Sequence, residues 1–206
     1  MKNLVEVKNL KKSYDLKEAV RGISFKIKDN EILGLLGPNG SGKTTTIGMM
    51  LGLLKPSNGE IIIDGKKIED NRIEILKKIN FISPYIELPK KLTVKQNLIV
   101  YGKLYSVPDI KKRIEYLSEK LRLEDLLNRI TGELSSGQKN RVSLAKALIN
   151  NPKVLLLDEP TASLDPEIGD YVRTFLENYK KEKKISILLA SHNMNEVTRL
   201  CKSILM

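Results

Sequence analysis

The segment from Gly37 to Thr44, which reads Gly-Pro-Asn-Gly-Ser-Gly-Lys-Thr, limits this chain to a small group of folds. It follows an apolar run, Ile32 to Leu36, that predicts a strand, and it precedes residues 43–54, which predict a helix. A glycine-rich loop in that setting can wrap its backbone N–H groups around a phosphate, while the following helix adds its positive N-terminal end. We therefore expect an α/β fold with a phosphate-binding loop. The alternative is a glycine-rich turn that matches the pattern by accident.

The second half of such a site is expected at the end of another buried strand, because ligands of open α/β sheets bind at the carboxyl ends of strands. Val154 to Leu157 is an unbroken apolar run typical of a parallel strand buried on both faces, and Asp158 and Glu159 follow it. Asp158 would hold Mg²⁺ through water, and Glu159 would polarise the attacking water as general base. Lys43 can reach the β- and γ-phosphates, and the Thr44 hydroxyl can ligate Mg²⁺. Two acids after a strand are by themselves more often part of a solvated loop or a helix cap, but the phosphate loop favours the catalytic interpretation.

The rest of the chain predicts a helical region between two stretches of α/β pattern. Short β-branched runs open the chain and return after residue 150, whereas strand signals vanish from Thr93 to Asn150. Apolar residues there recur at intervals of four, three and four, which places them on one helix face. These residues are Ile110, Ile114, Leu117 and Leu121. We expect one domain, with an α/β core over about 1–84 and 151–206 that has a mainly parallel sheet and an N-terminal antiparallel β part, and with a helical subdomain over about 85–150 inserted into it.

Composition narrows the class of protein. The chain of 206 residues has 36 Lys and Arg against 25 Asp and Glu, a formal net charge of +11, without the interleaved aromatic residues that stack on bases. We interpret this charge as a solvated lysine-rich surface and expect no nucleic-acid partner, with the cytoplasmic face of a membrane as the alternative interpretation. No apolar run is long enough to cross a bilayer, no export signal opens the chain, and the single cysteine, Cys201, fits a reducing cytoplasm. Because the chain stops at Met206, directly after a short strand signal, we expect it to be truncated.

One further segment points to a family. Leu134-Ser135-Ser136-Gly137-Gln138 lies between the two halves of the predicted site, at the start of a predicted helix. It resembles the signature motif of ABC ATPases, and the resemblance covers the whole chain. A Ser-Ser-Gly turn at a helix N-terminus offers hydroxyls and free N–H groups to an anion, and one of its serines also caps the helix. Two such domains pack head to tail in the family, so the resemblance implies that Ser135 and Gly137 act on ATP held by a second subunit, identical or different.

The resemblance also implies roles that the residue pattern leaves open. Tyr14 falls where ABC ATPases place an aromatic residue that stacks on adenine, although by itself it reads as a strand-surface tyrosine. His192, the only histidine in the chain, is similar to the family's switch histidine, which contacts the γ-phosphate. Ser163-Leu164-Asp165 resembles the loop that crosses the dimer interface, and Asp165 also caps the helix that begins at Pro166.

The site implied by the resemblance has three kinds of residue. Catalytic roles are expected for Glu159, His192 and Lys43. Thr44 and Asp158 are expected to ligate Mg²⁺. The residues expected to bind ATP are Tyr14, Gly37, Pro38, Asn39, Gly40, Ser41, Gly42, Lys43, Thr44, Thr45, Ser135, Ser136, Gly137 and Gln138.

One position departs from the family's pattern. The family usually has a glutamine shortly after the strand that we predict at Phe81 to Ser83, where it senses Mg²⁺ and the transmembrane partner. Spacing places Pro84 or Tyr85 at that site, with Glu87 as a speculative substitute. A milder change is Ser136, where the family more often has glycine. We expect an active ATPase in which water positioning or coupling differs.

Three functions are compatible with this resemblance. The first is the ATP-hydrolysing subunit of a transporter, working with a separate integral-membrane subunit at the inner, cytoplasmic face of the cell membrane. Segments 51–59, 159–165 and 191–197 resemble exporter-type subunits encoded as lone chains. The second is a soluble ABC ATPase that remodels nucleic acid or ribosomes, and the third is a catalytically weak, ATP-dependent clamp or regulator, which the missing glutamine favours and Glu159 opposes. We expect the first, with ATP and Mg²⁺ as cofactors and with a second ABC ATPase subunit as a further partner.

Overall fold

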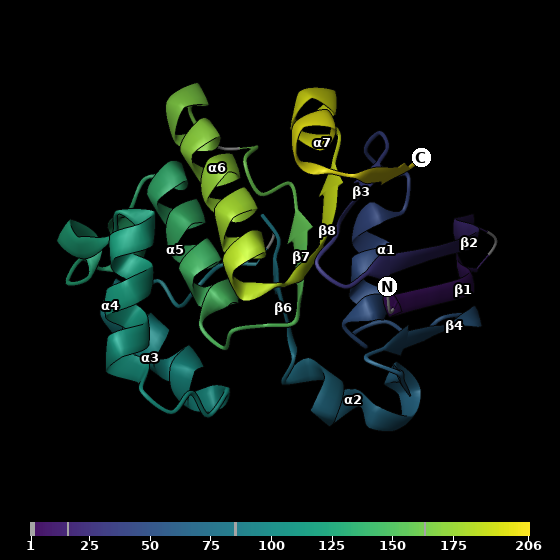
Figure 1. Cartoon of the computed structure of the whole chain (residues 1–206), viewed down its shortest axis with the longest axis horizontal. Coiled ribbons are helices and arrows are strands. Elements are labelled where there is room, and N and C mark those ends of the chain that lie inside the picture. The colour runs from purple at the N-terminus through teal and green to yellow at the C-terminus, as the bar shows by residue number, and fades with distance from the viewer. Residues whose placement is uncertain (1–2, 16, 85, 163) are drawn as a thin grey trace.

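Two sheets and the helices around them make up the part of the chain that the structure describes (Figure 1). The computed structural model describes residues 3–15, 17–84, 86–162 and 164–206. The antiparallel sheet has the strand order β2-β1-β4-β5, with the bounds Lys17–Lys28, Asn3–Tyr14, Asn58–Ile63 and Lys66–Lys67. The parallel sheet has the order β6-β7-β8-β3-β9, with the bounds Ile79–Ile82, Val154–Asp158, Ser186–Ser191, Ile32–Leu36 and Ser203–Leu205. The predicted parallel sheet and N-terminal antiparallel part are therefore both confirmed.

The helices lie between these strands along the chain. Helices α1 and α2 span Lys43–Met50 and Ile68–Leu76, and α6 and α7 span Pro166–Lys183 and Met194–Leu200. Between β6 and β7 come α3, α4 and α5, with the bounds Val94–Leu104, Ile110–Leu121 and Ser136–Leu148. In Figure 1 these three helices gather at one end of the molecule, opposite the antiparallel sheet. The region in which strand signals vanish accordingly contains these three helices, joined by loops and by short 3-10 turns at Glu124–Leu126 and Thr131–Glu133, with an isolated strand-like bridge between Thr93 and Ile130.

Strand β7 is buried at every position because different elements cover its two faces. Leu155 and Leu157 belong to a core that they share with helices α3 to α6. Val154 and Leu156 belong to a second core, built with α1 and the antiparallel sheet. Since successive side chains of a strand point to opposite faces, a strand covered on both sides must be apolar throughout. The unbroken apolar run is thus explained.

In helix α4 the apolar residues that the helical spacing places on one face are the ones that pack into the core. Ile114, Leu117 and Leu121 are at most 4% exposed and lie in the core, while Ile110 packs at its edge. Asp109 caps the helix by accepting a hydrogen bond from the N–H of Lys112 at 3.1 Å. The apolar stripe fixes which side of α4 faces its neighbours.

Helix α1 is shorter than the sequence predicts, ending at Met50 rather than near Leu54. Gly52 has a φ of +62°, and its N–H donates to the Met49 carbonyl at 3.0 Å. The N–H of Leu53 donates to the Gly48 carbonyl at 2.9 Å, which completes a Schellman motif. Glycine adopts this left-handed conformation at little cost, so the chain turns here in spite of the apolar residues that follow. A smaller correction is that β6 ends at Ile82 instead of Ser83.

Helix α7 packs closely against strand β3 at Gly34. A Cβ atom on Gly34 would lie 2.7 Å from Val197 Cγ1 and 3.0 Å from Cys201 Sγ, which is too close for a larger residue. Burial raises the pKa of the Cys201 thiol to about 12, with the charge of Glu196 as a smaller cause. Helix α7, which begins two residues after His192, therefore packs directly on the strand that leads into the phosphate loop.

Lys146 joins helix α5 to strand β6 inside the protein. The residue is 7% exposed, and its Nζ donates to the Phe81 carbonyl at 2.9 Å and lies 4.7 Å from the centroid of the Phe81 ring. Burial lowers the pKa of Lys146 from 10.5 to about 8, because the charged amine loses its hydration.

This lowered pKa predicts a pH dependence of stability. Between about pH 8 and 10.5 the unfolded chain binds more protons at Lys146 than the folded chain does, so the contribution of this residue to stability rises with pH. We expect the free energy of unfolding of the wild type, minus that of Lys146→Met, to increase by about 1 kcal/mol per pH unit in this range. Urea denaturation of both proteins from pH 7 to pH 10 measures it, and a constant difference would contradict the assignment.

Candidate functional site

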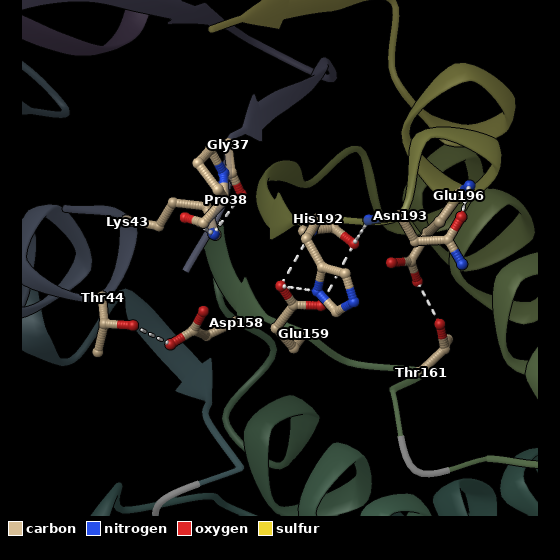
Figure 2. A network of polar contacts seen from close by, with 11 residues as sticks. Gly37, Pro38, Lys43, Thr44, Asp158, Glu159, Thr161, His192, Asn193 and Glu196 are labelled. Carbon is tan, nitrogen blue, oxygen red and sulfur yellow. Dashed lines mark hydrogen bonds and ion pairs between the residues drawn. The ribbon is translucent and has the colours of Figure 1, made fainter. Parts of the chain in front are cut away.

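Strands β3, β7 and β8 end at the same edge of the parallel sheet and bring several of the predicted site residues together (Figure 2). The phosphate loop follows β3, and Asp158 is the last residue of β7. His192 follows β8, whose residue Ala190 lies beside Asp158 in the strand register. Because this edge collects loops from different parts of the chain, residues more than a hundred positions apart become neighbours.

The phosphate loop encloses the side chain of Lys43. The Lys43 Nζ donates to the carbonyls of Gly37 at 2.6 Å and Pro38 at 3.0 Å, and the residue is 7% exposed. Gly42 has a φ of +92°, and a Cβ atom there would lie 2.4 Å from the carbonyl oxygen of Ala19 in β2. Only glycine fits where the loop crosses that strand. The result is a loop with an ammonium at its centre and a helix N-terminus behind it, which suits a bound phosphate.

Thr44 and Asp158 form the second part of the site. The Thr44 hydroxyl donates to Asp158 Oδ2 at 2.9 Å, and Asp158 is 2% exposed. Burial raises the pKa of Asp158, and the charge of Glu159 adds to this, while the hydroxyls of Thr44 and Ser83 and the charge of Lys43 oppose it. A hydroxyl and a carboxylate are the oxygen ligands that Mg²⁺ prefers, and Mg²⁺ commonly completes its shell with phosphate and water. The donor set therefore fits Mg²⁺; the described residues contain no cluster of three or more His, Cys, Asp or Glu that could enclose a metal unaided.

Glu159 and His192 are in direct contact. Glu159 Oε1 lies 2.7 Å from His192 Nδ1 and accepts from the His192 backbone N–H at 3.0 Å. The backbone of Glu159 is left-handed, with a φ of +51°, and its N–H donates to the Ala190 carbonyl at 2.9 Å. This conformation turns the carboxylate away from β7 and towards the end of β8. The Glu159 side chain is 14% exposed and that of His192 is 57% exposed, so the pair borders solvent.

The signature segment forms a capping box at the start of α5. The Gln138 N–H donates to Ser135 Oγ at 3.3 Å, and Gln138 Oε1 accepts from the Ser135 N–H at 3.0 Å. The prediction that a serine caps this helix is confirmed. Ser135 and Ser136 are exposed, and residues 135–138 do not line the two cavities that border the phosphate loop. Within one chain, the structure does not bring the signature segment to the phosphate loop.

The remaining predicted residues lie around this centre. Asn39, Gly40 and Ser41 form the exposed tip of the phosphate loop, and Thr45 is half-buried in α1. Tyr14 ends β1, is 46% exposed and has the Lys12 Nζ 5.0 Å from its ring centroid, outside the linings of both cavities beside the loop. Tyr85 and Ser163, which the sequence analysis considered, lie outside the described residues.

Three polar residues near the site were not predicted. The Thr161 hydroxyl donates to Glu196 Oε1 at 2.6 Å, and both residues are buried. A sequence signal existed, because Glu196 is one residue before Val197 and four before Leu200, on the face of α7 that packs inwards. Ser83 is also close to Asp158, since Ile82 is paired with Leu157 in the parallel register. The sequence analysis considered Pro84, Tyr85 and Glu87 in this region and passed over Ser83.

Comparison with known proteins decides the family. The sequence profile described as ABC transporter matches residues 20–162. The chain belongs to the ABC transporter family. It is 40% identical, over 192 residues, to the ABC transporter ATP-binding protein NatA of Bacillus subtilis, with 92% of this chain and 78% of the relative covered. It is 38% identical, over 199 residues, to the Nod factor export ATP-binding protein I of Paraburkholderia xenovorans, of which it spans 65% while 96% of this chain is covered.

Solved structures of ABC cassettes have the same fold. The dimeric structure of MJ0796, a bacterial ABC transporter cassette, matches with a TM-score of 0.89 and 29% identity, covering 97% of this chain and 92% of that one. A post-hydrolysis state of the same cassette, bound to ADP and Pi, matches with a TM-score of 0.88 and 30% identity, also covering 97% of this chain and 92% of that one. The chain is therefore an ATP-binding member of the ABC family with the ABC ATPase fold. None of the helices in the described ranges is long and apolar enough to span a bilayer.

Proposed function

We propose that this chain hydrolyses ATP to power a separate membrane-spanning transporter, as an exporter-type subunit at the inner face of the cell membrane. The observation that carries the ATPase activity is the convergence of Lys43, the Thr44–Asp158 pair and the Glu159–His192 pair at one sheet edge. The transporter role rests on the family, and the direction of transport rests on relatives named for export, such as the Nod factor protein.

In the proposed reaction each side chain has a distinct task. Lys43 neutralises charge on the β- and γ-phosphates, and the loop N–H groups hold them in place. Thr44 and Asp158 hold Mg²⁺, which when bound neutralises developing charge on the phosphate oxygens. Glu159 accepts a proton from the attacking water, and His192 keeps the Glu159 carboxylate in position while it offers its exposed ring to the γ-phosphate.

Coupling to transport is proposed to depend on two copies of the cassette, identical or different. The exposed N-terminus of α5, with Ser135 and Gly137, would close over ATP held by the other copy, while Tyr14 stacks on adenine. ATP thereby favours a closed dimer, and its hydrolysis favours reopening. A cavity of about 290 Å³ between Pro84, Glu87 and α5 lies where the core over about 1–84 and 151–206 meets the helical subdomain over about 85–150. We assign the contact with the membrane subunit to this surface.

The dimer hypothesis has a direct test. With ATP and Mg²⁺, Glu159→Gln is expected to shift from a monomer of 23.3 kDa to about twice that mass, because bound ATP is no longer hydrolysed. Size-exclusion chromatography with light scattering measures the shift. ADP should leave the protein monomeric, as should ATP with the double variant Lys43→Met/Glu159→Gln. A mass that never responds to ATP would contradict ATP-driven closure.

The transporter role is tested by purification from the native cells. A tagged chain, extracted in a mild detergent, should bring down a multi-span membrane protein in stoichiometric amount. Ribosomes or nucleic acid in its place would favour the remodelling function instead, and the ATP site would keep its assignment.

A further inference from the structure

The loop that follows the proposed general base is joined to helix α7 by a buried hydrogen bond (Figure 2). Thr161 Oγ1 donates to Glu196 Oε1 at 2.6 Å. Thr161 is 9% exposed and Glu196 is 2% exposed, so water does not compete for this contact. Nothing in the reaction proposed above uses either side chain.

A carboxylate in this place needs an explanation, because burying one is unfavourable unless charge or hydrogen bonds compensate. Glu196 makes no ion pair with a lysine or arginine in the described part of the chain. Arg199 of the same helix turns the other way and bonds to Asp170 and Glu177 of α6. The hydroxyl of Thr161 is therefore the side-chain donor that satisfies Glu196. A hydrogen bond to a carboxylate is stronger than one between neutral groups, and here the hydroxyl is the donor and the carboxylate the acceptor.

This contact closes a ring of interactions around the base. From Glu196 the ring passes to Asn193, whose Oδ1 accepts from the Glu196 N–H at 3.3 Å. Asn193 is next to His192, which contacts Glu159 Oε1 through its backbone N–H at 3.0 Å and through its imidazole Nδ1 at 2.7 Å. From Glu159 the backbone returns to Thr161 after two residues. Each side of the ring is short, so a shift of the loop against α7 must also move Glu159 against His192.

We propose that Thr161 and Glu196 are positioning residues for the general base. Their hydrogen bond fixes the loop 159–162 to the start of α7 and thereby holds the Glu159 carboxylate against His192. The proposal rests on the assignment of Glu159 as base in the proposed function. Catalysis is sensitive to such placement, since a misplacement of about 1 Å can lower a rate about 10²-fold.

The kinetic test compares the buried threonine that donates to Glu196 with an exposed threonine of α7. Thr161→Val keeps the shape and removes the hydroxyl, and it should lower kcat about 10- to 100-fold with the KM for ATP within about threefold. Thr161→Ser should restore most of the lost rate, because its hydroxyl can still reach Glu196. The matched control is Thr198→Val, because the exposed Thr198 hydroxyl donates only to carbonyls of its own helix, Met194 at 2.9 Å and Asn195 at 3.3 Å. Thr198→Val should leave kcat unchanged.

A second readout does not depend on turnover. His192 is the only histidine in the chain, so ¹⁵N-histidine labelling gives one pair of ring signals, provided that the purification tag is removed. Thr161→Val should shift the Nδ1 signal towards that of Glu159→Gln, in which the carboxylate partner is lost, whereas Thr198→Val should not. Glu196→Asp, one methylene shorter at the same charge, should reproduce both effects if Thr161→Val does not fold.

The outcomes separate this proposal from the function on which it rests. If kcat stays within twofold and the His192 signals do not move in Thr161→Val and Glu196→Asp, the positioning role is wrong, whatever the activity of the wild type. If both variants lose stability but keep their kcat and histidine signals, the bond is only structural and the proposal is overturned as well. A wild type that binds ATP without hydrolysing it, in which Thr161→Val still displaces the His192 signals, would overturn the proposed ATPase but keep the link between the two elements.

Discussion

Replacing Glu159 with glutamine is expected to lower the turnover of ATP by about 10²- to 10⁴-fold and to leave the dissociation constant for ATP within about threefold. Glutamine has the size of glutamate but cannot accept the proton of the attacking water. The side chain lies beside His192 and outside the contacts of the Lys43 ammonium with the phosphate loop, so binding should be spared. Steady-state phosphate release gives kcat, and fluorescence of a labelled ATP analogue gives the affinity.

The control for Glu159→Gln is the same change at an exposed site. Glu69→Gln, at the start of α2, removes one negative charge from the surface and should change neither quantity. The left-handed backbone at residue 159, with a φ of +51°, accepts glutamine as it accepts glutamate, so folding should be unaffected. Turnover within a few-fold of the wild type would mean that another group takes the proton, and the assignment of Glu159 would fall.

The second large effect is expected for Lys43→Met, which keeps the apolar stem and removes the ammonium. Hydrogen bonds to charged groups contribute about 1.5–3 kcal/mol each, so the affinity for ATP should fall about 10- to 150-fold. The variant also leaves the carbonyls of Gly37 and Pro38 without the donor that now reaches them at 2.6 and 3.0 Å. We therefore expect the loop to be less ordered as well as less attractive to phosphate.

Isothermal titration with ATP and Mg²⁺ measures the loss of affinity. Lys95→Met, an exposed substitution in α3, controls for the loss of one positive charge from a chain whose net charge is +11. If Lys43→Met and Lys95→Met bind ATP equally well, the general positive charge of the surface holds the nucleotide and the loop lysine does not.

The parts of this site that could be predicted from the sequence are those fixed by local chemistry. The loop at 37–44 needs glycine at position 42, because a Cβ atom there would lie 2.4 Å from the Ala19 carbonyl oxygen. The apolar strand before Asp158 reflects burial on both faces. The end of α1 could also have been predicted, because a glycine that follows a helix is a recognised stop signal. The apolar residues around Gly52 instead suggested that the helix continued to about Leu54.

Contacts between residues at the ends of different strands could not be predicted from the sequence, except where the resemblance to the family implied them. Glu159 and His192 were singled out separately, and their contact depends on the parallel pairing of β7 with β8. The spacing of Glu196 from Val197 and Leu200 already places it on the inward face of α7, but no sequence pattern links it to Thr161. That Thr161 is its partner becomes visible only when the two elements are seen side by side.

The packing of α7 on β3 has a practical consequence for measuring motion. Cys201 is the only cysteine in the chain, and its pKa of about 12 means that only about one molecule in ten thousand carries the thiolate at pH 8. Thiol-reactive labels attack the thiolate, so they should pass over Cys201. A cysteine introduced at an exposed residue, such as Lys95, would then be the single labelled position in each copy, and spin or fluorescent probes could report the distance between two cassettes without any change to the interior.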